Sequence, residues 1–208
     1  MAAGYAGLGE DPDRLLEGLA AFTGTRRRFE LKGEVAGVRV VDDYAHNPGK
    51  VAAVVDTGAE LAAPGRLVVV FQPHLYSRTR DFAGALAASL SPADVVVVMD
   101  VYAAREDPVP GVSGALVADR IDDRVQTHYV ASWSQAAPTV AGLVRPGDLV
   151  ITVGAGDVTM VGPEILRLLA EAGQGGAVGA PDPADHADSP AAPEAPAAAA
   201  APAPGTDG

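Results

Sequence analysis

Cysteine is absent from all 208 residues of the chain, so neither a disulfide nor a thiolate metal site can form. Apolar runs are short, and none approaches the roughly 18 residues that a membrane-spanning helix needs. Residues 1–5 have neither a basic start nor a long apolar stretch, which predicts no signal peptide. These absences lead us to expect a cytoplasmic protein.

Positive charge is also scarce, because 15 Lys and Arg stand against 27 Asp and Glu, for a net charge of −12. Proteins that bind nucleic acids or anionic membranes generally need a basic surface, so we expect neither partner here. Residues 172–208 contain five of the acidic residues and no Lys or Arg. Any anion-binding site must therefore be local.

Short runs of Val, Ile and Leu alternate with helix-length segments from residue 67 onward. Such runs are typical of strands buried on both faces, and the alternation predicts right-handed βαβ crossovers. The expected strands are 28–31, 38–41, 67–71, 94–99, 127–130 and 149–153, and the expected helices are 49–61, 80–90, 113–121, 132–144 and 162–171. The fold class is therefore α/β and Rossmann-like, with a mostly parallel six-stranded sheet and helices on both faces.

The two ends of the chain differ from this pattern. Residues 12–22 place Leu15, Leu19 and Phe22 on one face of a predicted amphipathic helix. Residues 173–208 consist largely of Gly, Ala, Pro and Asp, with too little apolar variety to offset the entropy of ordering. We expect this segment to be a disordered acidic tail, and a Pro/Ala-rich linker to another domain is the alternative.

Two polar segments come directly after apolar runs. Residues 42–48 read Asp-Asp-Tyr-Ala-His-Asn-Pro, and residues 72–80 read Gln-Pro-His-Leu-Tyr-Ser-Arg-Thr-Arg. If both runs are parallel strands, both segments lie at the carboxyl edge of one sheet, where open α/β sheets bind ligands. The sequence therefore predicts one cleft with carboxylate, histidine and arginine side chains.

The first segment offers both acceptors and donors. Asp42 and Asp43 are suited to a ribose hydroxyl or a magnesium ion, and His46 and Asn47 can donate to phosphate or carboxylate oxygens. The alternative is a plain turn, because Asp-Asp and Asn-Pro pairs favour turns for backbone reasons.

The second segment is richer in positive charge. Arg78 and Arg80 carry guanidinium forks that match a carboxylate or phosphate, and His74 and Tyr76 are further donors. The alternative is a solvated helix start, which we expect for Arg80 because Asp81 is adjacent.

Three weaker signals remain. Arg26, Arg27 and Arg28 are suited to a phosphate or form a solvated patch, and Gly154-Ala-Gly156-Asp could bring backbone N–H groups close to an anion. A lone Gly-x-Gly is weak and lacks the later glycine of a dinucleotide fingerprint, which disfavours an NAD-type oxidoreductase. His128 and His186 are interpreted as structural or incidental, and the sequence contains no Walker-type phosphate loop.

Taken together, residues 27–30, 42–48, 71–79, 100–106 and 154–157 resemble the C-terminal domain of the Mur ligases of peptidoglycan synthesis. The Gln-Pro-His-x-Tyr-Ser-Arg-Thr block favours the branch that joins L-alanine to UDP-N-acetylmuramate. Family members have a UDP-sugar domain, a central ATPase domain and a Rossmann-like C-terminal domain. The resemblance implies that residues 1–24 are a remnant of the central domain, residues 25–172 are the C-terminal domain, and the first two domains are missing partners.

The resemblance also implies a reaction and a set of site residues. In the family, ATP activates the muramoyl carboxylate as an acyl phosphate, which the amine of L-alanine then attacks. By resemblance, Arg28, Asp43 and Tyr44 would contact ATP, while His46, His74 and Arg78 would be the catalytic residues that orient L-alanine and the acyl phosphate. The remaining substrate-binding residues would be Tyr44, Asn47, Gly154 and Gly156. Mg2+ would be bound mainly by the missing central domain, so we expect no metal ligand here and no activity from this fragment alone.

One departure from the family pattern bears on the substrate. The alanine branch usually has His-His-Pro where this chain has His46-Asn47-Pro48, and His-Asn-Pro is commoner in relatives that add other amino acids. The alternatives are therefore a Mur-type ligase with a different amino acid, or a stand-alone nucleotide- or amino-acid-binding module without catalysis.

Overall fold

The computed structural model describes residues 13, 14, 16, 17 and 25–175. Most of the helix predicted over residues 12–22 lies outside this part of the chain, although the four described residues within it are helical. The tail predicted from residue 173 lies outside it from residue 176 onward. Residues 173–175 belong to the last helix, which therefore continues four residues beyond its predicted end at residue 171.

Six strands form one sheet in the order β1-β2-β6-β3-β4-β5. Strands β1 (Glu30–Val35) and β2 (Val38–Asp43) make an antiparallel hairpin, and every other neighbouring pair is parallel. The remaining strands are β3 (Leu67–Phe71), β4 (Val95–Met99), β5 (Gln126–Val130) and β6 (Leu149–Val153). The predicted mostly parallel six-stranded sheet is confirmed.

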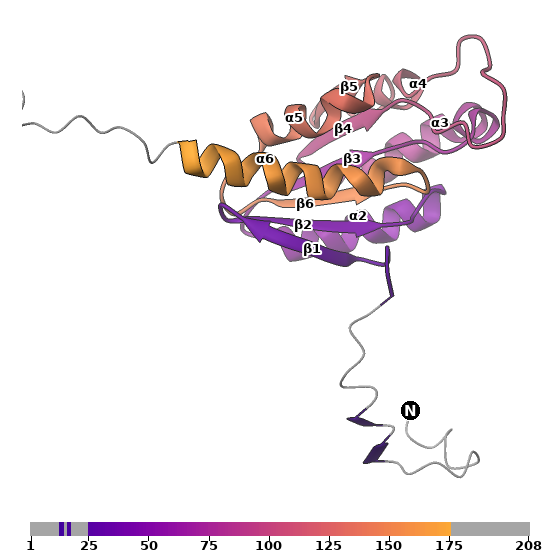
Figure 1. Ribbon diagram of the computed structural model, residues 1–208. Helices are drawn as coiled ribbons and strands as arrows, with labels where there is room; N and C mark the ends of the chain where they lie inside the picture. The colour runs from indigo at the N-terminus through magenta and orange to yellow at the C-terminus, as the bar shows by residue number, and fades with distance from the viewer. Residues whose placement is uncertain (1–12, 15, 18–24, 176–208) are drawn as a thin grey trace, which may run out of the picture.

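Helices cover both faces of the sheet (Figure 1). One face packs against α2 (Pro48–Ala62), α3 (Tyr76–Leu90) and the single turn α4 (Ala115–Ala118). The other face packs against α5 (Trp133–Leu143), the 3-10 turn η2 (Asp157–Met160) and α6 (Val161–Gly175). Every residue of β3, β4 and β6 is buried, because helices exclude water from both faces of these central strands.

Two helix predictions were wrong in extent. Helix α3 begins at Tyr76 instead of residue 80, because the carbonyl of Leu75 accepts both the N–H and the hydroxyl of Thr79. The helix expected over 113–121 is only one turn long. Gly114 before it packs so tightly that a Cβ would lie 2.0 Å from the carbonyl oxygen of Met99.

Strands β2, β3, β4 and β6 all end at one edge of the sheet, as the parallel registers require. The loops that leave this carboxyl edge contain the polar segments singled out from the sequence. Within the described part of the chain, no helix combines the length and apolar character needed to cross a bilayer.

Candidate functional site

Three side chains at the carboxyl edge form what we call the histidine–arginine cluster: His46, His74 and Arg78. His46 follows β2, His74 follows β3, and Arg78 lies in the first turn of α3. The ring centres of the two histidines are 5.8 Å apart. The predicted convergence of the two polar segments is therefore confirmed.

The cluster holds two buried polar atoms without a hydrogen-bond partner among the described residues, His74 Nδ1 and Arg78 Nη1. A buried polar atom without a partner typically costs about 1–3 kcal/mol, and more when it is charged. Native proteins keep such atoms mainly where a ligand, ion or water completes them. The cluster therefore has the character of a binding site for a polar or anionic group.

The charge of this cluster comes chiefly from Arg78. Burial lowers the pKa of His74, and electrostatic interactions with Arg78 and then with His46 lower it further, against a weaker opposing effect of Glu106. His74 is therefore neutral near pH 7. A neutral imidazole beside a permanently charged guanidinium suits an anionic ligand that also needs a directional hydrogen bond.

One hydrogen bond assigns a proton to Nδ1 of the His46 ring. His46 Nδ1 lies 2.9 Å from the carbonyl oxygen of Tyr44, and a carbonyl can only accept a hydrogen bond. Nδ1 therefore donates to Tyr44, which leaves Nε2 as the ring nitrogen for a ligand. The Tyr44 ring meets the His46 ring edge-on at 5.2 Å.

Residues 100–114, which follow β4, bring Tyr102 against His74. The Tyr102 ring stacks on His74 at 5.9 Å with an interplanar angle of 16°. The Tyr102 N–H donates to the carbonyl of Pro73, and the Tyr102 carbonyl accepts the N–H of Leu75. The Glu106 carboxylate accepts both the N–H and the hydroxyl of Ser77 at the start of α3, and these bonds lower the pKa of Glu106.

Asn47 and Asp43 have local structural roles. Asn47 Oδ1 accepts the N–H of Lys50 and caps α2, so the turn interpretation of the Asn-Pro pair describes its local geometry. The Asp43 carboxylate accepts the N–H groups of Phe29 and Ala45, each at 2.8 Å. The predicted contacts of Asp43 with ribose and of Asn47 with substrate stay predictions.

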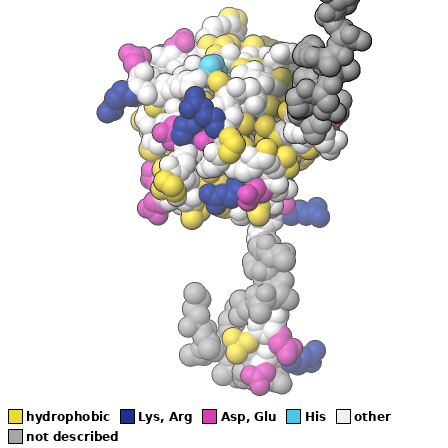
Figure 2. Space-filling view, turned by 90° about the vertical axis from the view of Figure 1, so that its left-hand side faces the viewer, with side chains coloured by type: hydrophobic (Ala, Val, Ile, Leu, Met, Phe, Trp, Pro, Cys, Tyr) yellow, Lys and Arg dark blue, Asp and Glu magenta, His cyan; other side chains and the backbone are white. Residues whose placement is uncertain are grey.

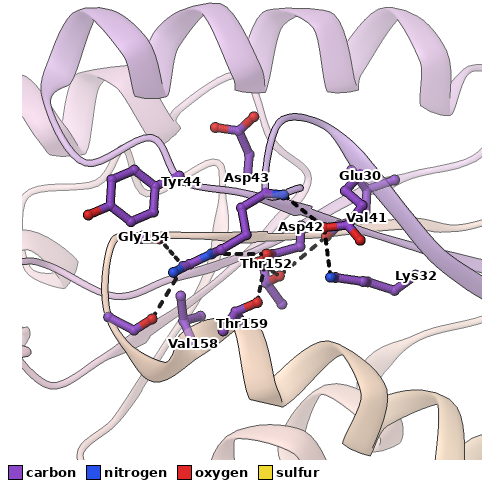
Figure 3. A network of polar contacts seen from close by, with 12 residues as sticks. Glu30, Lys32, Val41, Asp42, Asp43, Tyr44, Thr152, Gly154, Val158 and Thr159 are labelled. Atoms are coloured by element: carbon purple, nitrogen blue, oxygen red, sulfur yellow. Dashed lines mark hydrogen bonds and ion pairs between the residues drawn. The ribbon is translucent and has the colours of Figure 1, made fainter. Parts of the chain in front are cut away.

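A second group of contacts, which we call the Arg27 network, lies between β2 and β6. Arg27 Nε is 3.3 Å from Asp42 Oδ2, and Nη2 donates to the carbonyls of Gly154 at 2.7 Å and Gly156 at 3.2 Å. Asp42 is 0% exposed and also accepts the hydroxyls of Thr152 and Thr159, each at 2.7 Å (Figure 3). The Asp42 carboxylate is thus enclosed, and the ribose or magnesium role considered for it from sequence does not fit this burial.

Arg27 is the residue that sequence reasoning missed. Arg26, Arg27 and Arg28 were grouped as one patch, with Arg28 chosen for the nucleotide. In the structure Arg28 is exposed and Arg27 is partly buried, with its guanidinium carbon 4.8 Å from the centre of the Tyr44 ring. Only the need of a buried strand-end aspartate for a counterion could have indicated Arg27.

The two glycines after β6 are explained by close packing. A Cβ on Gly156 would lie 2.5 Å from Tyr102 Cγ and 2.4 Å from Gln72 Oε1, and one on Gly154 would lie 2.8 Å from the Gln72 carbonyl oxygen. The Gly154 N–H already donates to the carbonyl of Asp43. The Gly154 N–H, which the sequence suggested for anion binding, is therefore engaged within the protein. The carbonyls of both glycines accept hydrogen bonds from Arg27.

The opposite, amino edge of the sheet is different. In Figure 2 its Lys and Arg side chains lie beside Asp and Glu. Arg66 pairs with Asp148 at 2.7 Å, and a shallow hollow of about 290 Å³ is flanked by the pair Asp122–Arg124.

Two further predictions concern Arg80 and metal ligands. Arg80, near the start of α3, is exposed and pairs with Asp81, as expected from sequence. Nowhere in residues 25–175 are three or more His, Asp or Glu residues grouped to hold a metal.

Comparison with known proteins gives one consistent result. The model of the family described as "Mur ligase, glutamate ligase domain" matches residues 27–156. The UDP-N-acetylmuramate–L-alanine ligase of Saccharopolyspora erythraea is 60% identical over 169 residues, which are 80% of this chain and 34% of that protein. The corresponding ligase of Kineococcus radiotolerans is 60% identical over 165 residues, 79% of this chain and 35% of its own length. The chain thus spans about a third of the length of these relatives.

Solved structures agree. The crystal structure of UDP-N-acetylmuramate–alanine ligase from Thermotoga maritima matches with a TM-score of 0.64 and 27% identity, over 82% of this chain and 36% of that one. A bifunctional folylpolyglutamate synthase/dihydrofolate synthase from Yersinia pestis shares the fold with a TM-score of 0.55 at 20% identity, over 76% of this chain and 34% of that one.

Proposed function

Since the chain belongs to the Mur ligase family, we propose that it is the C-terminal domain of an ATP-dependent ligase that joins L-alanine to UDP-N-acetylmuramate. The observation that carries the proposal is the histidine–arginine cluster at the carboxyl edge, with two polar atoms that no described residue partners. The names of relatives that are 60% identical support the same substrates. The product is a precursor of peptidoglycan.

The reaction divides into activation and amide formation. The muramoyl carboxylate takes the terminal phosphoryl group of ATP, and the resulting acyl phosphate is attacked by the amine of L-alanine. The alanine ammonium loses one proton to become the attacking amine, and the nitrogen loses a second proton as the C–N bond forms. The bond between the acyl carbon and the phosphate oxygen breaks, and phosphate leaves. Orientation and charge stabilisation supply most of the catalysis in such a step.

In this proposal the cluster orients L-alanine and the acyl phosphate. Arg78 Nη1 and His74 Nδ1 bind an anionic oxygen, which would complete both atoms. His46 Nε2 accepts a hydrogen bond from the alanine ammonium, because Nδ1 is already committed to the Tyr44 carbonyl. In this arrangement Arg78 supplies positive charge, His74 supplies a directional hydrogen bond, and His46 supplies an acceptor for the ammonium group.

ATP would lie along the adjoining part of the edge. Exposed Arg28 and Tyr44 are accessible to a nucleotide, and Asp43 would bind the ribose through oxygens that already accept backbone N–H groups. Mg2+ would neutralise the transferring phosphates. Its ligands would lie mainly in the central domain that the family resemblance implies. That domain would act together with this one in the cytoplasm.

Arg78→Ala in the complete ligase tests the amino-acid site. We expect the KM for L-alanine to rise about 100-fold, as for loss of a charged hydrogen bond, while the KM for ATP changes less than about threefold. Arg80→Ala is the matched control, since Arg80 lies two residues further along α3, exposed and paired with Asp81. Equal rises in both KM values would remove Arg78 from the amino-acid site.

The choice of substrate is tested by phosphate release. The chain alone, and the chain fused to the first two domains of a related ligase, are supplied with ATP, UDP-N-acetylmuramate and either L-alanine, glycine or L-serine. Release only by the fusion, and fastest with L-alanine, is the expected result. A preference for another amino acid would favour the related ligase that His46-Asn47-Pro48 suggests, and ligand binding without turnover in either form would favour a non-catalytic module.

A further inference from the structure

We propose that Arg27 is a positioning residue for the nucleotide: it holds the Tyr44 ring and the Gly154–Gly156 loop in the geometry that receives ATP. The inference rests on the proposed function, in which Tyr44 borders ATP. It adds a residue that touches neither substrate nor reacting atoms and acts through Tyr44.

The guanidinium of Arg27 joins two segments that are far apart in the sequence. Its Nε reaches the carboxylate of Asp42 at the end of β2, and its Nη2 reaches the carbonyls of Gly154 and Gly156 after β6. Its guanidinium carbon lies over the Tyr44 ring, 4.8 Å from the ring centre, which is a cation–π distance. One side chain thus fixes the relative positions of the loops after two neighbouring strands.

Tyr44 needs this support because it is exposed, whereas the other residues that the Arg27 guanidinium contacts, Asp42, Gly154 and Gly156, are buried. Its side chain is 36% exposed, and the contacts that orient its ring are with Arg27 on its face and His46 at its edge. The Tyr44 N–H also donates to the Arg27 carbonyl at 2.9 Å, so backbone and side chain of Arg27 both hold this residue. In Figure 3 the Tyr44 ring lies beside Gly154, on the same side of the network.

The anchoring of Arg27 itself is strong. The Arg27 N–H donates to Glu30 Oε2 at 2.8 Å, and the Glu30 carboxylate is also paired with Lys32. Asp42 is held by two threonine hydroxyls, so the oxygen that Arg27 contacts cannot move freely. Arg27 also has a φ of 56°, a left-handed conformation that costs free energy for a side chain and is offset by these contacts.

Lysine cannot replace this geometry. A lysine ammonium could still neutralise Asp42, but as a compact point charge it lacks the planar fork that serves two carbonyls and a carboxylate while lying against a ring. Arg27→Lys therefore separates charge balance from positioning. If Arg27 only balanced the charge of Asp42, lysine would restore function.

The test is a double-mutant cycle in the complete ligase with Arg27→Lys, Tyr44→Ala and both together. Dissociation of a non-hydrolysable ATP analogue is measured by calorimetry, and the KM values for ATP and L-alanine by phosphate release. We expect each single change to weaken the analogue about tenfold, the double variant to be no weaker than Tyr44→Ala alone, and the KM for L-alanine to change less than about threefold.

A matched control is Arg39→Lys. Arg39 lies at the opposite end of β2, where Nη2 donates to the carbonyl of Leu61, so the substitution disturbs one carbonyl contact far from the edge. It should leave analogue binding unchanged. All measurements are made at least 10 degrees below the melting temperature of each variant, so that loss of folding does not enter them.

The outcomes separate the two proposals. Additive effects of Arg27→Lys and Tyr44→Ala, full rescue by lysine, or equal rises in the KM for ATP and L-alanine would overturn the positioning role. Tight analogue binding by the wild type without turnover on L-alanine would instead overturn the proposed substrate, while the binding cycle would still decide the role of Arg27.

Discussion

The Arg27 network and the histidine–arginine cluster lie at the same edge of the sheet and each contains an arginine, yet their hydrogen bonding differs. In the network, fully buried Asp42 has three side-chain donors, and Arg27 serves a carboxylate and two carbonyls. In the cluster, Arg78 and His74 each keep a buried polar atom without a partner among the described residues. The Arg27 network stabilises the fold. The histidine–arginine cluster keeps hydrogen-bonding atoms available for a ligand, at a cost in folding stability.

Asp42→Ala should show the largest effect on stability. It leaves partly buried Arg27 without its counterion and the Thr159 hydroxyl without its acceptor, while the Thr152 hydroxyl keeps only the Val41 carbonyl at 3.3 Å. We therefore expect a loss of about 3–4 kcal/mol in the free energy of unfolding. Urea unfolding of the 208-residue chain, followed by circular dichroism, measures it. A loss below about 1 kcal/mol would mean that the network is not what stabilises this edge.

Arg78→Met is the contrasting substitution for the same measurement. Removing a partly buried guanidinium whose Nη1 has no partner in the described part of the chain should leave stability unchanged or raise it by up to about 1 kcal/mol. A loss as large as that of Asp42→Ala would erase the contrast, because it would show that Arg78 also serves the fold.

Gly156→Ala should have the next largest effect. The added Cβ would overlap Tyr102 and Gln72, so we expect a loss of about 2 kcal/mol and a shift of the Tyr102 ring away from His74. The measurements are urea unfolding and a crystal structure of the variant. Gly84→Ala in α3 is the control, where a Cβ meets nothing within 4 Å and helix propensity predicts a gain of up to about 1 kcal/mol.

The two regions also differ in how far the sequence predicted them. The cluster was predictable, because short apolar runs located β2 and β3, and the polar residues after these two strands then had to share one edge of a parallel sheet. The start of α3 was missed because Tyr76 to Thr79 are polar site residues, which hide the helical period. Arg27 was missed because its partners include two backbone carbonyls 127 and 129 residues away, which no side-chain pattern encodes.

The smallest predicted effect concerns pH and tests whether His74 is held neutral. Its pKa lies below the ordinary value of 6.5 in the folded chain because of burial, and then because of Arg78 and His46. The unfolded chain therefore binds a proton more readily, so stability should fall as pH drops through 6.5 toward the folded pKa, and stay level above that range. His74→Gln removes this dependence and leaves the other titrating groups in place. The wild type should thus lose more stability than His74→Gln between pH 7.5 and 5.5 in urea unfolding. The opposite sign would mean that Glu106 outweighs Arg78 and that His74 is protonated in the fold, so that both His74 and Arg78 would be charged.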